Sequence, residues 1–351
     1  MTAPTARQVP GAVWTGTEMI IWGGANDFGF ALDTGGKYDP LFDGWLRVNQ
    51  IGAPMARFGH TIIWTGEEMI IWGGTSTAGY FNSGGSYAPG PDNWLPTNLS
   101  GAPETRAHHT AVWTGEEMIV WGGENGPKLL DSGGRYDPVS NGWRPLSSLG
   151  APAPRTDHTA VWTDRAMVIW GGVAGFNRFD AGGRYDPRSD RWQSINKARG
   201  PGARSHHTAV WTGKEMIIWG GQNIAGQLVN TGARYDPERD SWSPISTDNA
   251  PAARIYHTAV WTGQEMTIWG GSNLQVILNT GALYDPVADQ WRPISLAGVP
   301  YARMLHSAVW TGKGMIVWGG LGVRLIRFPF FPDLEALRSG GTYWAGVDGG
   351  P

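Results

Sequence analysis

Residues 106–152 read RAHHTAVWTGEEMIVWGGENGPKLLDSGGRYDPVSNGWRPLSSLGAP, and this pattern occurs seven times between Arg7 and the C-terminus. The tryptophan of a Trp-Thr-Gly or Trp-Thr-Asp triplet falls at Trp14, Trp64, Trp113, Trp162, Trp211, Trp261 and Trp310. A Trp-Gly-Gly triplet follows each of them, beginning at Trp22, Trp72, Trp121, Trp170, Trp219, Trp269 and Trp318. The repeat length is therefore 49 or 50 residues. Such a period indicates a solenoid, a propeller or another array of supersecondary units.

Each repeat predicts four short β-strands, named a to d here. In the quoted copy, residues 109–113 are rich in β-branched and aromatic side chains and form strand a, and residues 118–121 form strand b after a glycine turn. Strand c is expected at residues 134–136, and an Asp-Pro turn separates it from strand d, which carries Trp143. Strands a and b are almost entirely apolar, as expected for strands covered on both faces. Their tryptophans are therefore expected in the core.

A period of about 50 residues with a double glycine, a tyrosine and a tryptophan resembles the kelch family. The resemblance covers nearly the whole chain and implies an all-β fold, a seven-bladed β-propeller of four-stranded antiparallel blades. Residues 1–351 are expected to form one propeller, with blades that start near Arg7, Arg57, Arg106, Arg155, Arg204, Arg254 and Arg303. Blade 7 is expected to be atypical or incomplete, because Trp344 replaces the aspartate of the Tyr-Asp-Pro turn and few residues follow it.

Composition excludes several classes of protein. The formal net charge is −3, and the lysines and arginines are spread through the repeats, so nucleic acid is not expected as a partner. The chain has no cysteine, which excludes disulfides and thiolate metal sites. No apolar run approaches the ~20 residues that span a membrane. The chain begins in mid-repeat, which favours an extracytoplasmic protein whose leader is absent from this sequence, with a cytoplasmic location as the alternative. A monomer is expected.

An antiparallel meander brings the d–a loops, the first residues of strand a and the b–c loops to one face, around one mouth of the channel. Six histidines lie three positions after a repeat arginine and are expected to be scaffold residues that bond a carbonyl of the adjacent blade: His60, His109, His158, His207, His257 and His306. The repeat arginines are expected to face polar residues of the b–c loops, namely Asp33, Asn82, Asp131, Asp180, Asn230 and Asn279.

The position between the arginine and the histidine breaks the sevenfold symmetry. In blades 1 to 7 it holds Val9, Gly59, His108, Asp157, His206, Tyr256 and Leu305. A scaffold does not need this variation, so function is expected here. One interpretation is a divalent metal site made by His108, Asp157 and His206, with Tyr256 as a fourth group. The other is a set of hydrogen-bonding groups for a polar ligand, with no cofactor.

The b–c loops vary as binding loops do and add Phe28, Tyr80 and Arg178 to the ligand-binding candidates. Blade 7 carries an insertion at residues 321–339, LGVRLIRFPFFPDLEALRS, which adds Phe328. A single helical turn is expected at residues 333–337. The insertion is either a clasp over the incomplete blade or a lid beside the channel mouth.

These features favour a non-catalytic binding propeller that recognises a carbohydrate or protein ligand on the face of the d–a and b–c loops. The alternative is an enzyme, metal-dependent or acid/base and similar to the sugar mutarotases of the family, that uses His108, Asp157, His206 and Tyr256. Kelch adaptors present arginines to acidic peptides at corresponding positions, and this chain departs from that pattern. A copper site like that of galactose oxidase is excluded, because its crosslinked cofactor needs a cysteine.

Overall fold

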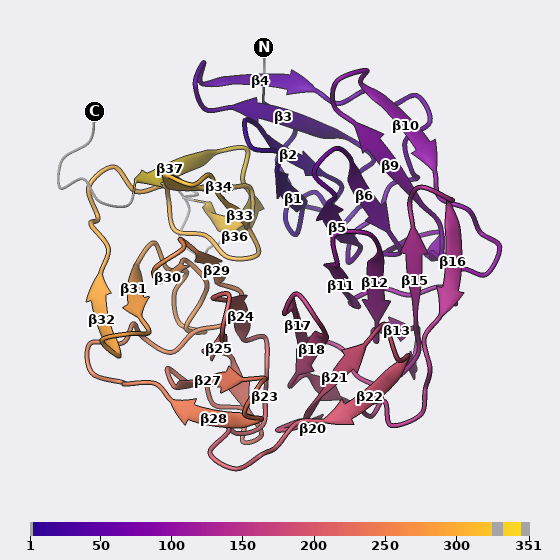
Figure 1. Ribbon diagram of the computed structural model, residues 1–351. Coiled ribbons are helices and arrows are strands. Elements are labelled where there is room, and N and C mark those ends of the chain that lie inside the picture. The colour runs from indigo at the N-terminus through magenta and orange to yellow at the C-terminus, as the bar shows by residue number, and fades with distance from the viewer. Residues whose placement is uncertain (1–2, 325–332, 345–351) are drawn as a thin grey trace.

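The computed structural model describes residues 3–324 and 333–344, and the described chain consists of short strands and loops without a helix. The strands form seven blades around a central channel (Figure 1). The predicted all-β, seven-bladed fold is therefore confirmed. In the described part of the chain, no helix is long and apolar enough to cross a membrane.

The strands of each blade follow one another in the order a, b, c, d. Blades 1 to 3 contain β1 (Gly11–Trp14), β2 (Met19–Trp22), β3 (Gly35–Asp39) and β4 (Gly44–Arg47); β5 (Thr61–Trp64), β6 (Met69–Trp72), β9 (Gly84–Ala88) and β10 (Asn93–Pro96); and β11 (Thr110–Trp113), β12 (Met118–Trp121), β15 (Gly133–Asp137) and β16 (Gly142–Pro145). Blades 4 to 6 contain β17 (Thr159–Trp162), β18 (Met167–Trp170), β21 (Gly182–Asp186) and β22 (Arg191–Ser194); β24 (Thr208–Trp211), β25 (Met216–Trp219), β27 (Gly232–Asp236) and β28 (Ser241–Pro244); and β29 (Thr258–Trp261), β30 (Met266–Trp269), β31 (Gly281–Asp285) and β32 (Gln290–Pro293).

Two-residue strands form in four of the b–c loops and in one segment that enters strand a. They are β7 (Thr75–Ser76) with β8 (Gly79–Tyr80), β13 (Glu124–Asn125) with β14 (Lys128–Leu129), β19 (Val173–Ala174) with β20 (Asn177–Arg178), and β23 (Arg204–Ser205) with β26 (Gln222–Asn223). Three of these pairs are hairpins within a b–c loop, and β23 joins β26 to the segment that enters strand a. Isolated bridges such as Ala107 with Glu124 make the same link in the other blades, so backbone hydrogen bonds order the loops on this face.

Blade 7 is smaller than the others, as predicted. Within the described residues it has three strands, β33 (Ser307–Trp310), β34 (Gly314–Trp318) and β37 (Gly340–Trp344). Its insertion forms a separate hairpin of β35 (Leu321–Arg324) and β36 (Asp333–Ala336). The predicted helical turn at residues 333–337 is therefore wrong, because β35 supplies backbone partners for this segment that one short helical turn could not provide.

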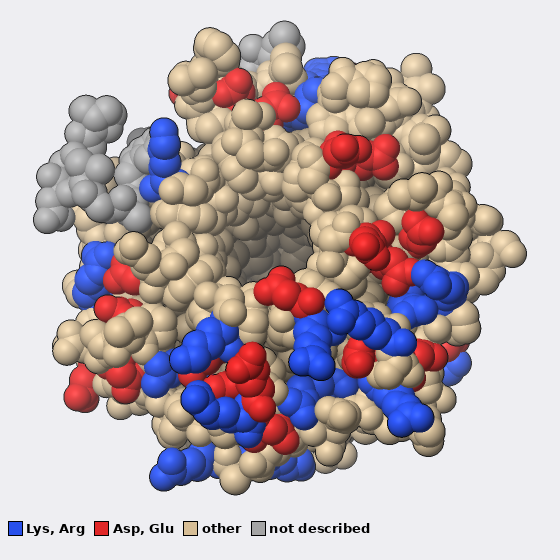
Figure 2. All heavy atoms as spheres, viewed as in Figure 1, with Lys and Arg blue, Asp and Glu red and all other residues tan. Residues whose placement is uncertain are grey.

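The blades close into a ring. The innermost strands β1, β5, β11, β17, β24, β29 and β33 each lie beside those of both neighbouring blades, and β33 lies beside β1. At the seam, the amide of Gly320 donates to the carbonyl oxygen of Arg7 at 2.9 Å, just as Gly123 donates to Arg155 at 2.9 Å within the ring. The junction of blades 7 and 1 thus uses the same contact as the other junctions, and a central hollow is visible in Figure 2.

The core lies between the blades. Trp121 of strand b is fully buried, and its ring lies 5.2 Å from that of His158 and 5.5 Å from that of Trp192, both in blade 4. The expectation of buried tryptophans is confirmed for strand b. It is wrong for strand a, where Val112 is buried but Trp113 is only half-buried. Trp113 ends its strand beside the a–b turn and packs at the edge of the core cluster between blades 2 and 3.

The double glycine of the repeat receives the histidine of the next blade. Gly73 has a φ angle of +70°, and a Cβ at this position would lie 2.5 Å from Cε1 of His109. Both the backbone conformation and the close approach require glycine. Spacing between Trp-Gly-Gly and histidine is therefore fixed by contact between blades.

Candidate functional site

A ring of seven left-handed residues surrounds the channel mouth on the face of the d–a and b–c loops. Their φ angles are +46° at Val9, +64° at Gly59, +55° at His108, +52° at Asp157, +55° at His206, +57° at Tyr256 and +57° at Leu305. Backbone hydrogen bonds join neighbours in this ring. His108 N donates to Gly59 O at 2.9 Å, and Leu305 N donates to Tyr256 O at 3.1 Å. The backbone therefore fixes where each side chain begins.

Six of these positions keep a side chain at an energetic cost. A left-handed backbone costs a non-glycine residue roughly 1–2 kcal/mol. Gly59 shows that glycine, which avoids this cost, fits the ring. The backbone therefore does not require side chains at the other positions, and the variation among them changes the chemistry of the mouth.

Asp157, His206 and Tyr256 form a continuous polar group across blades 4 to 6. His206 Nδ1 lies 3.8 Å from Asp157 Oδ1, and the rings of His206 and Tyr256 are 5.0 Å apart. The His206 and Asp157 side chains are 25% and 31% exposed, so solvent and ligands reach them. Burial and the nearby Asp157 carboxylate raise the pKa of the Tyr256 hydroxyl, which therefore stays a hydrogen-bond donor at neutral pH.

His108 was also predicted to belong to this group, but its side chain leans towards blade 2. Its ring packs over Gly59 of blade 2, where a Cβ would be 3.0 Å from Cε1 of His108. The residue is exposed. Across residues 3–324 and 333–344, no group of three or more His, Asp or Glu residues is arranged to hold a metal ion. This geometry lends no support to the proposed metal set of His108, Asp157 and His206.

Arg178 extends the polar group outward from the mouth. Its Nε donates to Ser205 Oγ at 3.1 Å, and its Nη2 donates to Gln222 Oε1. Ser205 is buried directly before His206. Sequence reasoning missed Ser205 and Gln222. The position after the repeat arginine also varies from blade to blade, and this signal could have identified Ser205.

The other histidine set is scaffold. His158 is buried, and its Nε2 lies 2.9 Å from the hydroxyl of Thr110 in the preceding blade. The backbone of Trp121 in that preceding blade also bonds this imidazole, in the way that was predicted. Four further histidines repeat the bond to a threonine hydroxyl, namely His109, His207, His257 and His306. Burial lowers the pKa of His158 to about 3, so its imidazole is neutral.

The repeat arginines are also scaffold, and the predicted facing residues are one position away from the real partners. Arg106 is fully buried and donates to Gly122 O at 3.0 Å, Ser132 O at 2.7 Å and Ser132 Oγ at 3.1 Å. The predicted partner was Asp131. Burial lowers the pKa of Arg106 to about 10, which still leaves the guanidinium charged. The arginine binds main-chain carbonyls because both ends of the b–c loop present them here.

The remaining candidates lie in b–c loops. Phe28 is 82% exposed, and Tyr80 is half-buried in β8. Phe328 lies outside the described residues. The insertion contacts blade 1, since Ala336 N donates to the Asp27 carboxylate.

Large exposed apolar side chains gather on the b–c loops, which lie on the same face as the mouth. We name this set the apolar crown; it comprises Phe28, Phe30, Phe176, Ile224, Leu274, Val276, Val323 and Leu334. The opposite face, made of a–b and c–d turns, carries Leu41, Phe42, Val139 and Val287. A cluster of exposed apolar side chains around a polar centre is typical of surfaces that bind other proteins.

Two comparisons with known proteins bear on this surface. The family model of the KLHDC2/KLHL20/DRC7 Kelch-repeats domain matches residues 1–150 and 108–320. No curated protein matches the chain significantly.

Proposed function

Because this chain belongs to the kelch-repeat family, we propose that it is a non-catalytic protein-interaction propeller whose ligand binds the face of the d–a and b–c loops. The polar group of Asp157, His206 and Tyr256 forms the centre of the site, and the apolar crown forms its surroundings.

The uneven distribution of apolar side chains carries this proposal. Phe176 at a b–c loop tip is 98% exposed, and the loops of blades 1, 5 and 6 present Phe28, Ile224 and Leu274 in the same way. Exposed apolar side chains gain free energy when a partner covers them, by about 25 cal/mol for each Å² removed from water. A protein ligand supplies matching apolar side chains around one central polar group.

A carbohydrate ligand fits the crown less well than a protein. Sugar rings stack on flat aromatic faces, whereas much of the crown is aliphatic, as at Ile224, Leu274 and Val276. The central group suits a donor from a polypeptide, since the Asp157 carboxylate accepts hydrogen bonds and Tyr256 donates one. These observations support a peptide segment with apolar residues on both sides of an N–H or ammonium donor.

The test is selection from a random peptide library displayed on phage, followed by calorimetric titration of the selected peptides. Asp157→Asn and His206→Asn remove the charge and the ring while keeping a residue that tolerates a left-handed backbone. Phe176→Ser tests the crown. We expect each variant to bind at least about tenfold more weakly than wild type, the loss typical of a central contact.

Val287→Ser is the matched control, because Val287 is 94% exposed on the opposite face. It should leave the affinity unchanged. Equal affinities for wild type and the three site variants would contradict the proposal. So would selection of no peptide together with binding, or turnover, of a sugar.

A further inference from the structure

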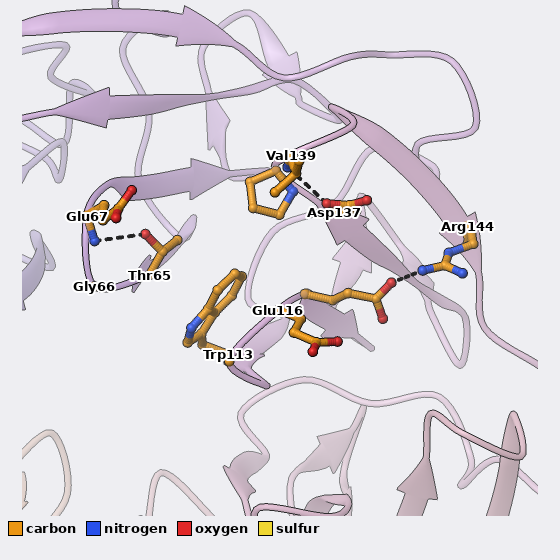
Figure 3. Close-up of a pocket in the computed structure, with 11 residues that line it drawn as sticks. Thr65, Gly66, Glu67, Trp113, Glu116, Asp137, Val139 and Arg144 are labelled. Carbon is orange, nitrogen blue, oxygen red and sulfur yellow. Dashed lines mark hydrogen bonds and ion pairs between the residues drawn. The ribbon is translucent and has the colours of Figure 1, made fainter.

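A second pocket opens on the opposite face, between the turns of blades 2 and 3. It has a volume of about 690 Å³ and lies among Trp113, the a–b turn residues Glu67 and Glu116, and the c–d turn residues Pro138 and Val139 (Figure 3). This face lies opposite the channel mouth, because the a–b turn and the b–c loop are at opposite ends of strand b. The pocket is thus independent of the proposed protein-binding face.

Three apolar residues, Trp113, Pro138 and Val139, line the pocket among its polar residues. The half-buried indole of Trp113 lies on one side, and Val139, which is 96% exposed, lies on the other (Figure 3). Trp113 ends strand a, so its ring is held by the strand, while the Asp-Pro turn fixes Pro138. The space between these apolar residues accepts a linear aliphatic chain, such as the methylene stem of a lysine or arginine side chain.

Two of the carboxylates at the pocket already have partners. Glu117 pairs with Arg144, and it also lies 3.7 Å from Nε of Arg135. Asp137 accepts hydrogen bonds from Val139 N at 2.9 Å and Ser140 Oγ at 2.6 Å. Internal contacts therefore satisfy these two groups.

Glu67 and Glu116 differ from them. Both are exposed, and neither carboxylate has a hydrogen bond or ion pair with another described residue. Their backbone amides bond the turn threonines Thr65 and Thr114, which holds each side chain outward at the pocket edge (Figure 3). They are the two acceptors that a cationic ligand would meet.

The pair of carboxylates is specific to this pocket. In the other blades the corresponding a–b turn residues are Thr17, Arg165, Lys214, Gln264 and Lys313. Only the junction of blades 2 and 3 has glutamate on both turns. Figure 2 shows mainly acidic side chains over β5 to β15, whereas lysine and arginine lie among acidic side chains over β17 to β28. Every blade has the tryptophan that ends strand a, but only the junction of blades 2 and 3 combines it with two turn glutamates.

We propose that this pocket binds a lysine or arginine side chain of a basic segment in a second protein partner. The methylene stem lies between Trp113 and Pro138, and the cationic end lies near Glu67 and Glu116. The indole covers the apolar stem, its face also attracts the nearby cation through its quadrupole, and the two exposed carboxylates accept the cationic end. The partner's basic side chain is thus recognised by both shape and charge.

The test is calorimetric titration of the full chain with hexalysine, acetylated at its N-terminus and amidated at its C-terminus, in low salt. The double variant Glu67→Gln and Glu116→Gln keeps the side-chain shape and should weaken binding about tenfold. Trp113→Leu should weaken it further than Trp113→Phe, because phenylalanine keeps an aromatic face. Hexa(acetyl-lysine) should not bind.

The control is the double variant Glu238→Gln and Asp248→Asn, which changes the net charge equally at exposed sites outside the pocket. It should bind hexalysine within about twofold of wild type, as expected for distant exposed charges. An equal loss in the control would show a general field effect and overturn the proposal. Equal binding by wild type and the Glu67/Glu116 variant would also overturn it. Peptide binding at the opposite face should be unaffected by every one of these changes.

Discussion

At the scale of single residues, the buried histidines connect this fold to pH. His158 is enclosed by the edge of Trp121 and the hydroxyl of Thr110, and burial lowers its pKa from 6.5 to about 3. The same lowering to about 3 holds for His60, His257 and His306, and the pKa values of His109 and His207 lie well below 6.5. The unfolded chain therefore binds more protons than the folded chain below pH 6.5.

Stability should thus be fully present above pH 6.5 and should fall as the pH drops from 6.5 towards 3. Each such histidine contributes a loss of about 2 kcal/mol at pH 5 relative to neutral pH. Six together approach the whole stability of a typical domain. Urea unfolding followed by tryptophan fluorescence between pH 8 and pH 5 measures this slope. A stability that is constant over this range would contradict the burial of neutral histidines.

The glycine that receives a histidine offers a second residue-scale prediction. Gly73→Ala should destabilise the protein by more than ~2 kcal/mol, because the new Cβ adds a clash with the His109 ring to the backbone strain. Gly202→Ala is the matched control, since Gly202 has nearly the same φ angle, +71°, but no atom lies within 4 Å of its Cβ position. Urea midpoints compare the two variants. Equal losses would show that strain alone, without inter-blade contact, explains the conserved spacing within the chain.

At the scale of elements, the two tryptophan sets of a blade have different tasks. Trp170 of strand b is 1% exposed between blades, whereas Trp162 of strand a is half-buried at the edge of a core cluster. Trp170→Ala should cost ~3–5 kcal/mol and Trp162→Ala clearly less, because the cost follows the volume emptied in the core. Chemical unfolding of both variants measures the difference. Equal losses would place both sets in the core, as the sequence alone predicted.

The repeat pattern and the alternation of side chains along a strand explain which features could be predicted from the sequence. The repeat of Trp113 and Trp121 was sufficient to predict seven blades and their strands. It did not reveal which of the last two residues of strand a is buried, because Val112 and Trp113 point to opposite sides of one short strand. The same limit applies to Arg106, whose partner is Ser132 and not Asp131. A shift of one residue along a strand turns the side chain to the other face, and the repeat pattern alone does not determine which of two adjacent residues makes a contact.

At the scale of the whole molecule, the disc has two unlike faces. One holds the apolar crown around the left-handed ring, and the other holds the pocket of Trp113, Glu67 and Glu116. The sequence indicated the ring through the variation at Val9 to Leu305, and it indicated which loops share its face. It did not indicate that His108 leans onto Gly59, since the direction in which each side chain leans depends on the neighbouring blade.

The most direct test of the central claim is hydrogen–deuterium exchange, measured by mass spectrometry, with a peptide selected on the wild-type protein. Binding at the crown and the polar centre should slow exchange at residues 173–178, 203–207 and 253–257, where backbone amides of the loop face lie. The a–b and c–d turns at residues 114–117 and 137–141 should exchange unchanged. Protection confined to those turns, with none at the loops, would contradict the assignment of the protein-binding face.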